Sequence, residues 1–102
     1  MNIAVIYGGR SGEHEVSLVS GAAVARNIKG HQVTLIGINH AGQWFVQEES
    51  EYKKICADSS AALSIIEKPE NRVSIIPGGK KAAFSVNGKE LAVDLVFPVV
   101  HG

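Results

Sequence analysis

The sequence predicts an α/β fold, with a small open parallel sheet, flanking helices and an added β-hairpin. Residues 2–7 and 94–100 are apolar at successive positions rather than alternating, which is typical of strands buried on both faces of a parallel sheet. A helical pattern separates the first run from another apolar segment at 32–39, the order expected of a β-α-β unit. An Asn-Gly pair at positions 87 and 88 is a strong hairpin signal.

The first apolar run leads through a glycine-rich loop into a helix that we expect from about Glu13 to Lys29. Glycines at such a junction let backbone N–H groups face outward at the carboxyl end of a strand, where open α/β sheets bind ligands. The first turn is acidic, Lys29 lies in the last turn, and Gly30 is suited to end the helix. Apolar side chains recur near helical spacing at Val16, Val19, Ala23 and Ile28, with Ala22 and Val24 beside them.

Shorter elements follow. After the strand at 32–39, a turn at His40-Ala41-Gly42 leads to a short strand at 43–47, a polar helix at 48–57 and a surface connection at 59–70. The hairpin region comprises residues 72–76, 82–86 and 89–92. The apolar run at 94–100 is expected to return to the parallel sheet beside the first strand. We find neither an internal repeat nor a low-complexity linker, so residues 1–102 are expected to form one domain.

Composition excludes several classes of function. Ten basic and ten acidic residues give a formal net charge of zero, which removes the electrostatic argument for binding nucleic acid or an anionic membrane. No apolar run approaches the roughly 20 residues of a membrane-spanning helix. The segment Met1-Asn2-Ile3 is expected to begin a strand rather than a secretion signal. The single Cys56, expected to be a partly buried spare thiol, excludes an internal disulfide framework and indicates a cytoplasmic protein.

The residues do not support either of two nucleotide-binding motifs, and they do not support a metal site. The glycine loop is not a dinucleotide fingerprint, because Arg10 and Ser11 stand where glycines are required. The segment Gly79-Lys80-Lys81 lacks the other residues of a phosphate-binding P-loop. His14 lies between two glutamates, but side chains at three consecutive helical positions diverge and cannot converge on one ion. We therefore predict no metal site.

Glu13 and Glu15 point roughly 200° apart on a helix, so only one of them can face a given ligand. Glu13 lies at the mouth of the loop, whereas Glu15 is expected to be solvated or paired with Arg10. From the residues alone, the favoured interpretation of Glu13 is a first-turn acid that stabilises its own helix by up to about 1 kcal/mol. His101 and Gly102 follow a strand at the same sheet edge, where a histidine can donate to a carboxylate or be structural.

Residues 7–18, Tyr-Gly-Gly-Arg-Ser-Gly-Glu-His-Glu-Val-Ser-Leu, closely resemble the opening signature of D-alanine–D-alanine ligases. Two further segments agree: residues 35–38 followed by Gly42-Gln43-Trp44, and residues 94–102. In that family a His-Gly pair begins a longer motif. This sequence contains that pair, at His101 and Gly102. The resemblance is weaker over residues 48–90. It implies that residues 1–102 are the Rossmann-like, pre-ATP-grasp N-terminal domain, which binds substrate.

The resemblance implies an enzyme that phosphorylates one D-alanine carboxylate with ATP and Mg²⁺ or Mn²⁺. The amine of a second D-alanine then attacks the acyl phosphate, giving the dipeptide of peptidoglycan precursors. ATP and metal would be bound by ATP-grasp domains outside residues 1–102, so no cofactor and no ligase activity are expected of this fragment. Family members are commonly homodimers, which implies that this protein forms one too.

The resemblance also assigns roles to residues. Glu13 matches the glutamate that holds the ammonium group of the first D-alanine. Val16 matches a residue that contacts the substrate methyl group, although packing against the sheet is an equal alternative. His101 matches the histidine that donates to the substrate carboxylate, and Gly102 lies beside it in the binding site. Glu13 and His101 are thus the candidate catalytic residues.

Other functions stay open. A sibling ligase that joins D-alanine to D-lactate or D-serine would share this domain, because the second substrate is chosen elsewhere. A stand-alone small-molecule binding or dimerisation module is the alternative from another functional class.

Overall fold

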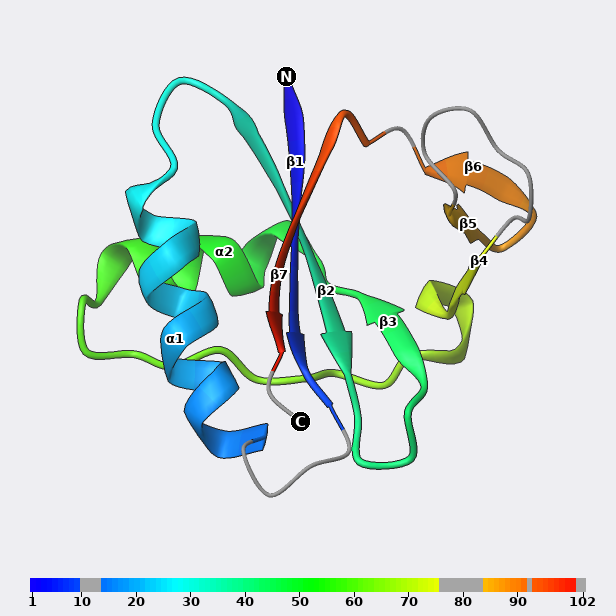
Figure 1. The fold of residues 1–102 in the computed structure, drawn as a ribbon, viewed down its shortest axis with the longest axis horizontal. Helices are drawn as coiled ribbons and strands as arrows, with labels where there is room; N and C mark the ends of the chain where they lie inside the picture. The colour runs from blue at the N-terminus through cyan, green and yellow to red at the C-terminus, as the bar shows by residue number, and fades with distance from the viewer. Residues whose placement is uncertain (10–13, 76–83, 92, 101–102) are drawn as a thin grey trace.

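In the computed structural model, which describes residues 1–9, 14–75, 84–91 and 93–100, the larger sheet has the strand order β3-β2-β1-β7 (Figure 1). Three of these strands are parallel, namely β1 (Asn2–Gly8), β2 (Gln32–Ile38) and β7 (Leu95–Val100). The short β3 (Trp44–Val46) runs antiparallel to β2. The predicted parallel sheet is therefore confirmed, with one antiparallel strand added at its edge.

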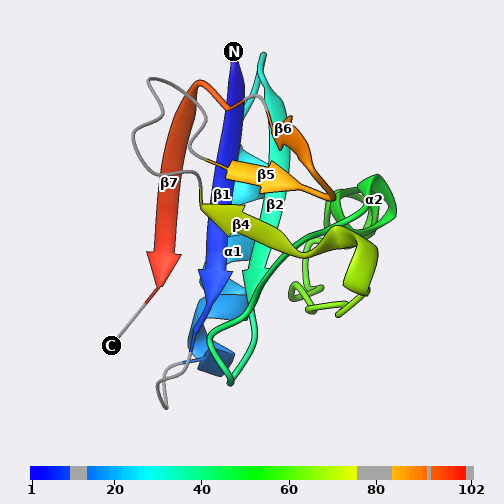
Figure 2. The ribbon, with the colours of Figure 1, turned by 90° about the vertical axis from the view of Figure 1, so that its right-hand side faces the viewer.

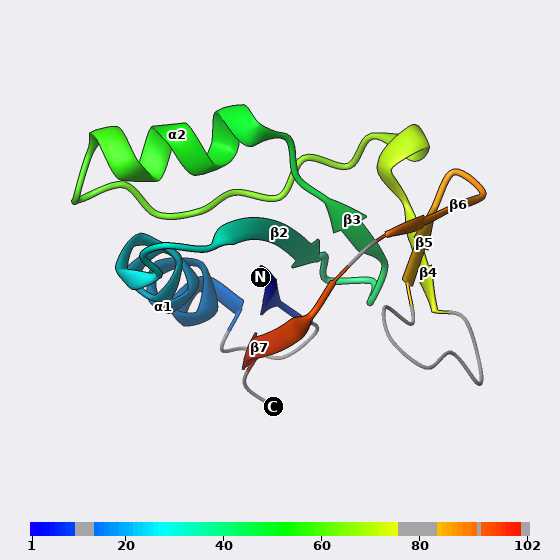
Figure 3. The same ribbon diagram turned by 90° about the horizontal axis from the view of Figure 1, so that it is seen from above.

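The molecule has three layers, as the views in Figures 2 and 3 show. Both helices, α1 (His14–Asn27) and α2 (Glu49–Ala57), lie on one side of the larger sheet. A second, antiparallel sheet lies on the other side and contains β4 (Val73–Ile75), β5 (Phe84–Val86) and β6 (Lys89–Leu91). A 3-10 turn, η1 (Pro69–Asn71), leads into it.

Side chains of β1 supply both hydrophobic cores, because successive residues of a strand point to opposite faces. Ala4 and Ile6 pack in the cluster that contains Val73 and Phe84 of the small sheet. Val5 and Tyr7 pack in the other cluster, together with residues of α1 and α2. All four β1 side chains are buried, as the continuous apolar run predicted.

Helix α1 packs on the sheet through small buried residues and through only some of the apolar positions that predicted the helix: Ala22, Val24 and Ile28 join the core cluster, but Val16 and Val19 do not. Ser17, Ala22 and Ala25 are buried, whereas Val16 and Val19 are 49% and 62% exposed. The approach is close: a Cβ atom on Gly21, the helical glycine of this face, would lie 3.0 Å from Cβ of Tyr7. The large Tyr7 side chain fills the layer from the strand, so the helix meets it at Gly21, whereas the larger Leu18, Val24 and Ile28 pack on the same cluster and are only partly buried.

The predicted hairpin is confirmed. Strands β5 and β6 pair in register around Asn87 and Gly88, whose φ angles are 52° and 79°. Positive φ at both central residues is the backbone that a two-residue hairpin turn requires, and Asn-Gly is the pair that adopts it most readily.

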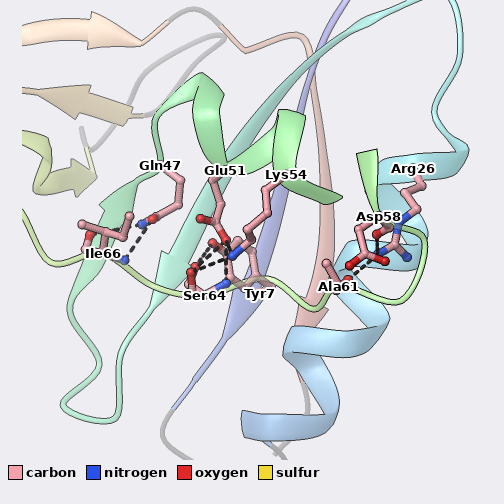
Figure 4. Close-up of polar contacts among 9 residues, drawn as sticks. All are labelled: Tyr7, Arg26, Gln47, Glu51, Lys54, Asp58, Ala61, Ser64 and Ile66. Carbon is pink, nitrogen blue, oxygen red and sulfur yellow. Dashed lines mark hydrogen bonds and ion pairs between the residues drawn. The ribbon is translucent and has the colours of Figure 1, made fainter. Parts of the chain in front are cut away.

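The segment at 59–70, predicted to be a surface connection, is partly buried. Residues 61–68 cross the helix side of the sheet in extended form, and Leu63 is only 2% exposed. The Leu63 N–H donates to the carbonyl of Leu18 at 3.1 Å, and the Ile66 N–H donates to Oε1 of Gln47 at 2.9 Å. Hydrogen bonds from other elements thus satisfy this backbone as they would in a strand (Figure 4).

Two predictions of burial were wrong. Strand β7 pairs with β1 as expected, but Leu95, Val96 and Phe97 are all more than 40% exposed. In the described part of the chain, β7 forms an end of the larger sheet, and neither flanking layer covers its first half. Cys56, expected to be partly buried, is exposed on α2.

Candidate functional site

Three strands end together at one edge of the larger sheet. Gly8, the last residue of β1, is in register with Ile38 at the end of β2 and with Val100 at the end of β7. The described part of α1 begins at His14, at the same end of the molecule (Figure 1). Carboxyl ends of parallel strands are where open α/β sheets bind ligands, so this edge is the candidate site.

Gly8 and Gly9 give the edge a backbone that other residues would not adopt. Their φ angles are +92° and +119°, in the region that favours glycine. A Cβ atom on Gly8 would lie 2.2 Å from the carbonyl oxygen of Ile38, which no side chain could tolerate. The Gly9 N–H donates to the same carbonyl at 2.9 Å. The chain therefore leaves β1 tightly bound to the end of β2.

Ser17 of α1 joins the ends of β1 and β7 at this edge. Its side chain is completely buried, and its hydroxyl accepts a hydrogen bond from the Gly8 N–H at 2.7 Å. The same hydroxyl donates to the carbonyl of Val99 in β7. One side chain of α1 thus holds the ends of β1 and β7. Sequence reasoning assigned no role to Ser17, since a serine within an amphipathic helix gives no signal of what it binds.

Of the predicted site residues, Glu13, His101 and Gly102 lie outside the described residues, as does Arg10, the expected partner of Glu15. Val16 is described, and half of its surface is exposed. The alternative in which Val16 packs in the core is therefore wrong, and its methyl groups are accessible in the first turns of α1. Glu15 is exposed, as expected of a solvated helical carboxylate.

Asn39 directly follows β2 at the same edge and organises its turn. Its side-chain oxygen accepts from the N–H groups of Ala41 and Gln43 at 3.0 and 2.8 Å. Its amide nitrogen donates to Oε1 of Glu67 at 2.6 Å and to Oε1 of Gln43 at 3.1 Å. Asn39 and Glu67 also line a hollow of about 300 Å³. Because the Asn39 amide is fully used in these bonds, it holds the turn in place rather than presenting a free group to a ligand.

A buried polar cluster lies on the helix side of the sheet, between β1 and α2 (Figure 4). The Tyr7 hydroxyl donates to the carbonyl of Ser64 at 2.6 Å. Oε1 of Glu51 accepts from the Ser64 N–H at 2.8 Å and from its hydroxyl at 2.9 Å, and pairs with the Lys54 ammonium at 2.8 Å. Sequence reasoning missed this cluster, because Tyr7 lies 57 residues from Ser64 and no local pattern links Ser64 to Glu51.

The ionisation of the cluster suits a structural role. Burial first, and then the charge of Glu51, raises the pKa of Tyr7 far above its usual range, so this hydroxyl stays protonated and cannot act as a base. Burial alone would raise the pKa of Glu51. The hydrogen bonds from Lys54 and Ser64 outweigh burial and lower it, so Glu51 stays ionised.

Neither a metal centre nor a membrane span is found in the described ranges. They contain no group of three His, Cys, Asp or Glu residues placed to hold an ion. No helix among the described residues is both long and apolar enough to cross a bilayer.

The chain matches known proteins along its whole length. Residues 2–102 match the family model described as D-ala D-ala ligase N-terminus. A D-alanine–D-alanine ligase of Treponema denticola is 43% identical over 104 residues, which cover all of this chain and 28% of that protein. The chain therefore spans less than a third of the length of this relative.

Solved structures agree with the sequence comparisons. The D-alanine–D-alanine ligase of Coxiella burnetii superposes with a TM-score of 0.72 over the whole chain and 29% of its own length, and its 24% identity supports the fold alone. The VanG D-Ala:D-Ser ligase of Enterococcus faecalis gives a TM-score of 0.71 at 34% identity, covering 99% of this chain and 29% of its own. The parallel sheet with its glycine-lined edge, the family match and these relatives together show that the chain belongs to the D-alanine–D-alanine ligase N-terminal domain family.

Proposed function

We propose that this chain is the N-terminal, substrate-binding domain of an ATP-dependent ligase that joins two D-alanines for peptidoglycan synthesis in the cytoplasm. The family match over residues 2–102 and the whole-chain identity to the T. denticola ligase support this proposal. The remainder of such a protein supplies the ATP-grasp domains. The domain by itself has no ligase activity, because it provides one wall of a site that the other domains complete.

The observation that carries the proposal is the pairing of two strand ends. Gly8 begins the loop that leads to Glu13, and Val100 directly precedes His101. Gly8 and Val100 are partners in the β1–β7 register, so the two strands end side by side. Such an edge can bring a carboxylate and an imidazole to a ligand as small as an amino acid.

Each residue then has a distinct role toward the first D-alanine. Glu13 pairs with its ammonium group, and as a first-turn acid it is kept ionised by the helix dipole. Val16, with half of its surface exposed, contacts the substrate methyl group. His101 donates to the carboxylate, beside the backbone of Gly102. These contacts would fix the D-configuration, since they hold three of the four substituents of the α-carbon.

ATP and Mg²⁺ are assigned to the rest of the protein. The described residues offer no group of acidic side chains placed to bind a divalent ion, so they do not fit a resident metal. No step through ATP or the metal is therefore derived for this chain, and the contribution of the domain is to bind and orient the first substrate.

A ligase that adds D-serine is the second candidate, because the VanG D-Ala:D-Ser ligase is 34% identical over nearly the whole chain. A D-lactate ligase or a stand-alone binding module would also fit this domain. Assaying the full-length protein with ATP and D-alanine, alone or with D-serine or D-lactate, distinguishes these cases. Formation of the D-alanyl dipeptide as the main product is expected. Absence of any ATP-dependent product would leave the stand-alone module.

The role of Glu13 is tested by comparing Glu13→Gln with Glu15→Gln in the full-length enzyme. Removing one charge of a desolvated pair costs about 2–5 kcal/mol. That cost corresponds to a loss of roughly 30-fold to several thousand-fold in kcat/KM for the first D-alanine, with ATP affinity close to normal. Glu15 is exposed, so its variant should lose less than about fivefold. Equal losses in the two variants would contradict the assignment.

We also propose that the full-length protein is a homodimer and that the face formed by α1 and the first half of β7 takes part in its interface. Val19, Leu95 and Phe97 are exposed there, and Phe97 lines an apolar hollow of about 350 Å³ with residues of α1. Contiguous exposed apolar surface is a feature of interaction sites. Sedimentation should show a dimer that Phe97→Asp weakens; a strict monomer at high concentration would remove the idea.

A further inference from the structure

The Ser17 hydroxyl meets the hydrogen-bonding needs of two strand ends at once. A hydroxyl both donates and accepts, and here it accepts from the N–H of Gly8 and donates to the carbonyl of Val99. Its partners are main-chain groups of two different strands, 9 and 82 residues away in sequence. The Ser17 side chain is completely buried, so water cannot take its place without rearrangement.

This arrangement is not what a helical serine does for its own helix. Serine within a helix usually turns to solvent or donates to the carbonyl four residues earlier. Ser17 instead uses its donor on β7 and its acceptor on β1, across the layer between helix and sheet. Strand pairing already holds the ends of β1 and β7 beside each other, and the two bonds of Ser17 tie both ends to the first turns of α1.

Those two strand ends lead to the residues proposed to hold the substrate. Gly8 begins the loop to Glu13, and Val99 lies two residues before His101. We infer that Ser17 is a positioning residue: without touching substrate, it fixes the ends of β1 and β7, from which the chain continues to Glu13 and His101, relative to α1. This inference rests on the proposed function of the same edge.

The test uses the full-length enzyme with Ser17→Ala, Ser17→Cys and, as a matched control, Ser20→Ala. Ala removes both bonds, whereas Cys keeps the size of the side chain with a weaker donor and acceptor. Ser20 is on the same helix, about 4.5 Å further along its axis, and loses the same atom. Rates are fitted for the KM of each D-alanine site and of ATP, and thermal melting reports folding.

Displacement of substrate-binding groups lowers the reaction rate far more than loss of a surface hydrogen bond does, because an error of about 1 Å can lower a rate by roughly 100-fold. The KM of the first D-alanine is expected to rise at least about tenfold in Ser17→Ala and less in Ser17→Cys. The KM of ATP should change less than about twofold, and Ser20→Ala should match the wild type. A purely structural role would lower the active fraction, and hence kcat, without changing KM selectively.

The inference is overturned if folded Ser17→Ala and Ser17→Cys both keep the wild-type KM for the first D-alanine, or if all KM values rise together. If Ser17→Ala does not fold, the comparison of Ser17→Cys with Ser20→Ala decides. A wild-type protein that forms no D-alanyl dipeptide refutes the proposed function instead. Hydrogen exchange at Gly8 then tests the bridge alone: faster exchange in the Ser17 variants supports it, and unchanged exchange overturns it.

Discussion

Replacing Arg26 by methionine should destabilise this domain strongly, because the Arg26 guanidinium joins α1 to the end of α2 (Figure 4). Its Nε donates to the carbonyl of Ile55 at 2.6 Å, and its Nη2 donates to the carbonyls of Ala61 and, at 3.2 Å, Asp58. The last carbonyls of a helix have no partner within the helix. A side chain from α1 therefore completes the C-terminal end of α2 and holds the chain that follows.

The expected loss in the free energy of unfolding follows from these contacts. Hydrogen bonds to a charged donor contribute about 1.5–3 kcal/mol each. The bond to Asp58 is exposed and long, so we count only the two partly buried ones. Allowing for water that replaces part of the loss, Arg26→Met should cost about 2–4 kcal/mol. Methionine keeps much of the apolar stem, so the loss reports mainly on the guanidinium.

Urea unfolding followed by circular dichroism measures this loss, and a domain of this size should also melt lower by at least about 8 °C. Arg26→Lys should lie between methionine and wild type, because an ammonium group cannot form the planar fork. Arg72→Met is the matched control: Arg72 is exposed and lies 5.9 Å from the ring centroid of Phe45, a contact that contributes about 0.5–1 kcal/mol. Equal losses for Arg26→Met and Arg72→Met would refute the reasoning.

Two further predictions concern the sheet edge and the buried carboxylate. Gly8→Ala should unfold the domain or destabilise it by more than about 3 kcal/mol, because a Cβ at this position would meet the Ile38 carbonyl. Gly9→Ala has no such contact and should cost only about 1–3 kcal/mol of backbone strain. Equal urea midpoints for the two variants would contradict this prediction. The lowered pKa of Glu51 stabilises the fold above the unfolded pKa of about 4.3, and this stabilisation is lost as pH falls through the lower folded value. Glu51→Gln should therefore flatten the decrease in the free energy of unfolding between about pH 5 and 3. A variant with the same acid slope as the wild type would refute this assignment.

Much of the fold could be predicted from local patterns. The continuous apolar run of residues 2–7 predicted a strand buried on both faces, and Asn87-Gly88 predicted the hairpin turn with positive φ at both positions. These predictions succeed because strand burial and turn conformation depend on residues that are adjacent in sequence. The resemblance carried by residues 7–18 likewise predicted the family, which the comparisons confirm. The roles of Glu13 and His101 stay predictions.

Tertiary structure decided what depends on contacts between distant residues. The fully buried residues of α1 are small, because the Tyr7 side chain fills the layer from the strand, and Val16 lies outside this contact and is exposed. Residues 61–68 are held across the sheet by contacts to Ser64 from Tyr7, 57 residues away, and from Glu51, 13 residues away. Ser17 shows the difference most clearly. Sequence alone marks it as one polar residue in a helix, and only the packed fold brings two strand ends to its hydroxyl.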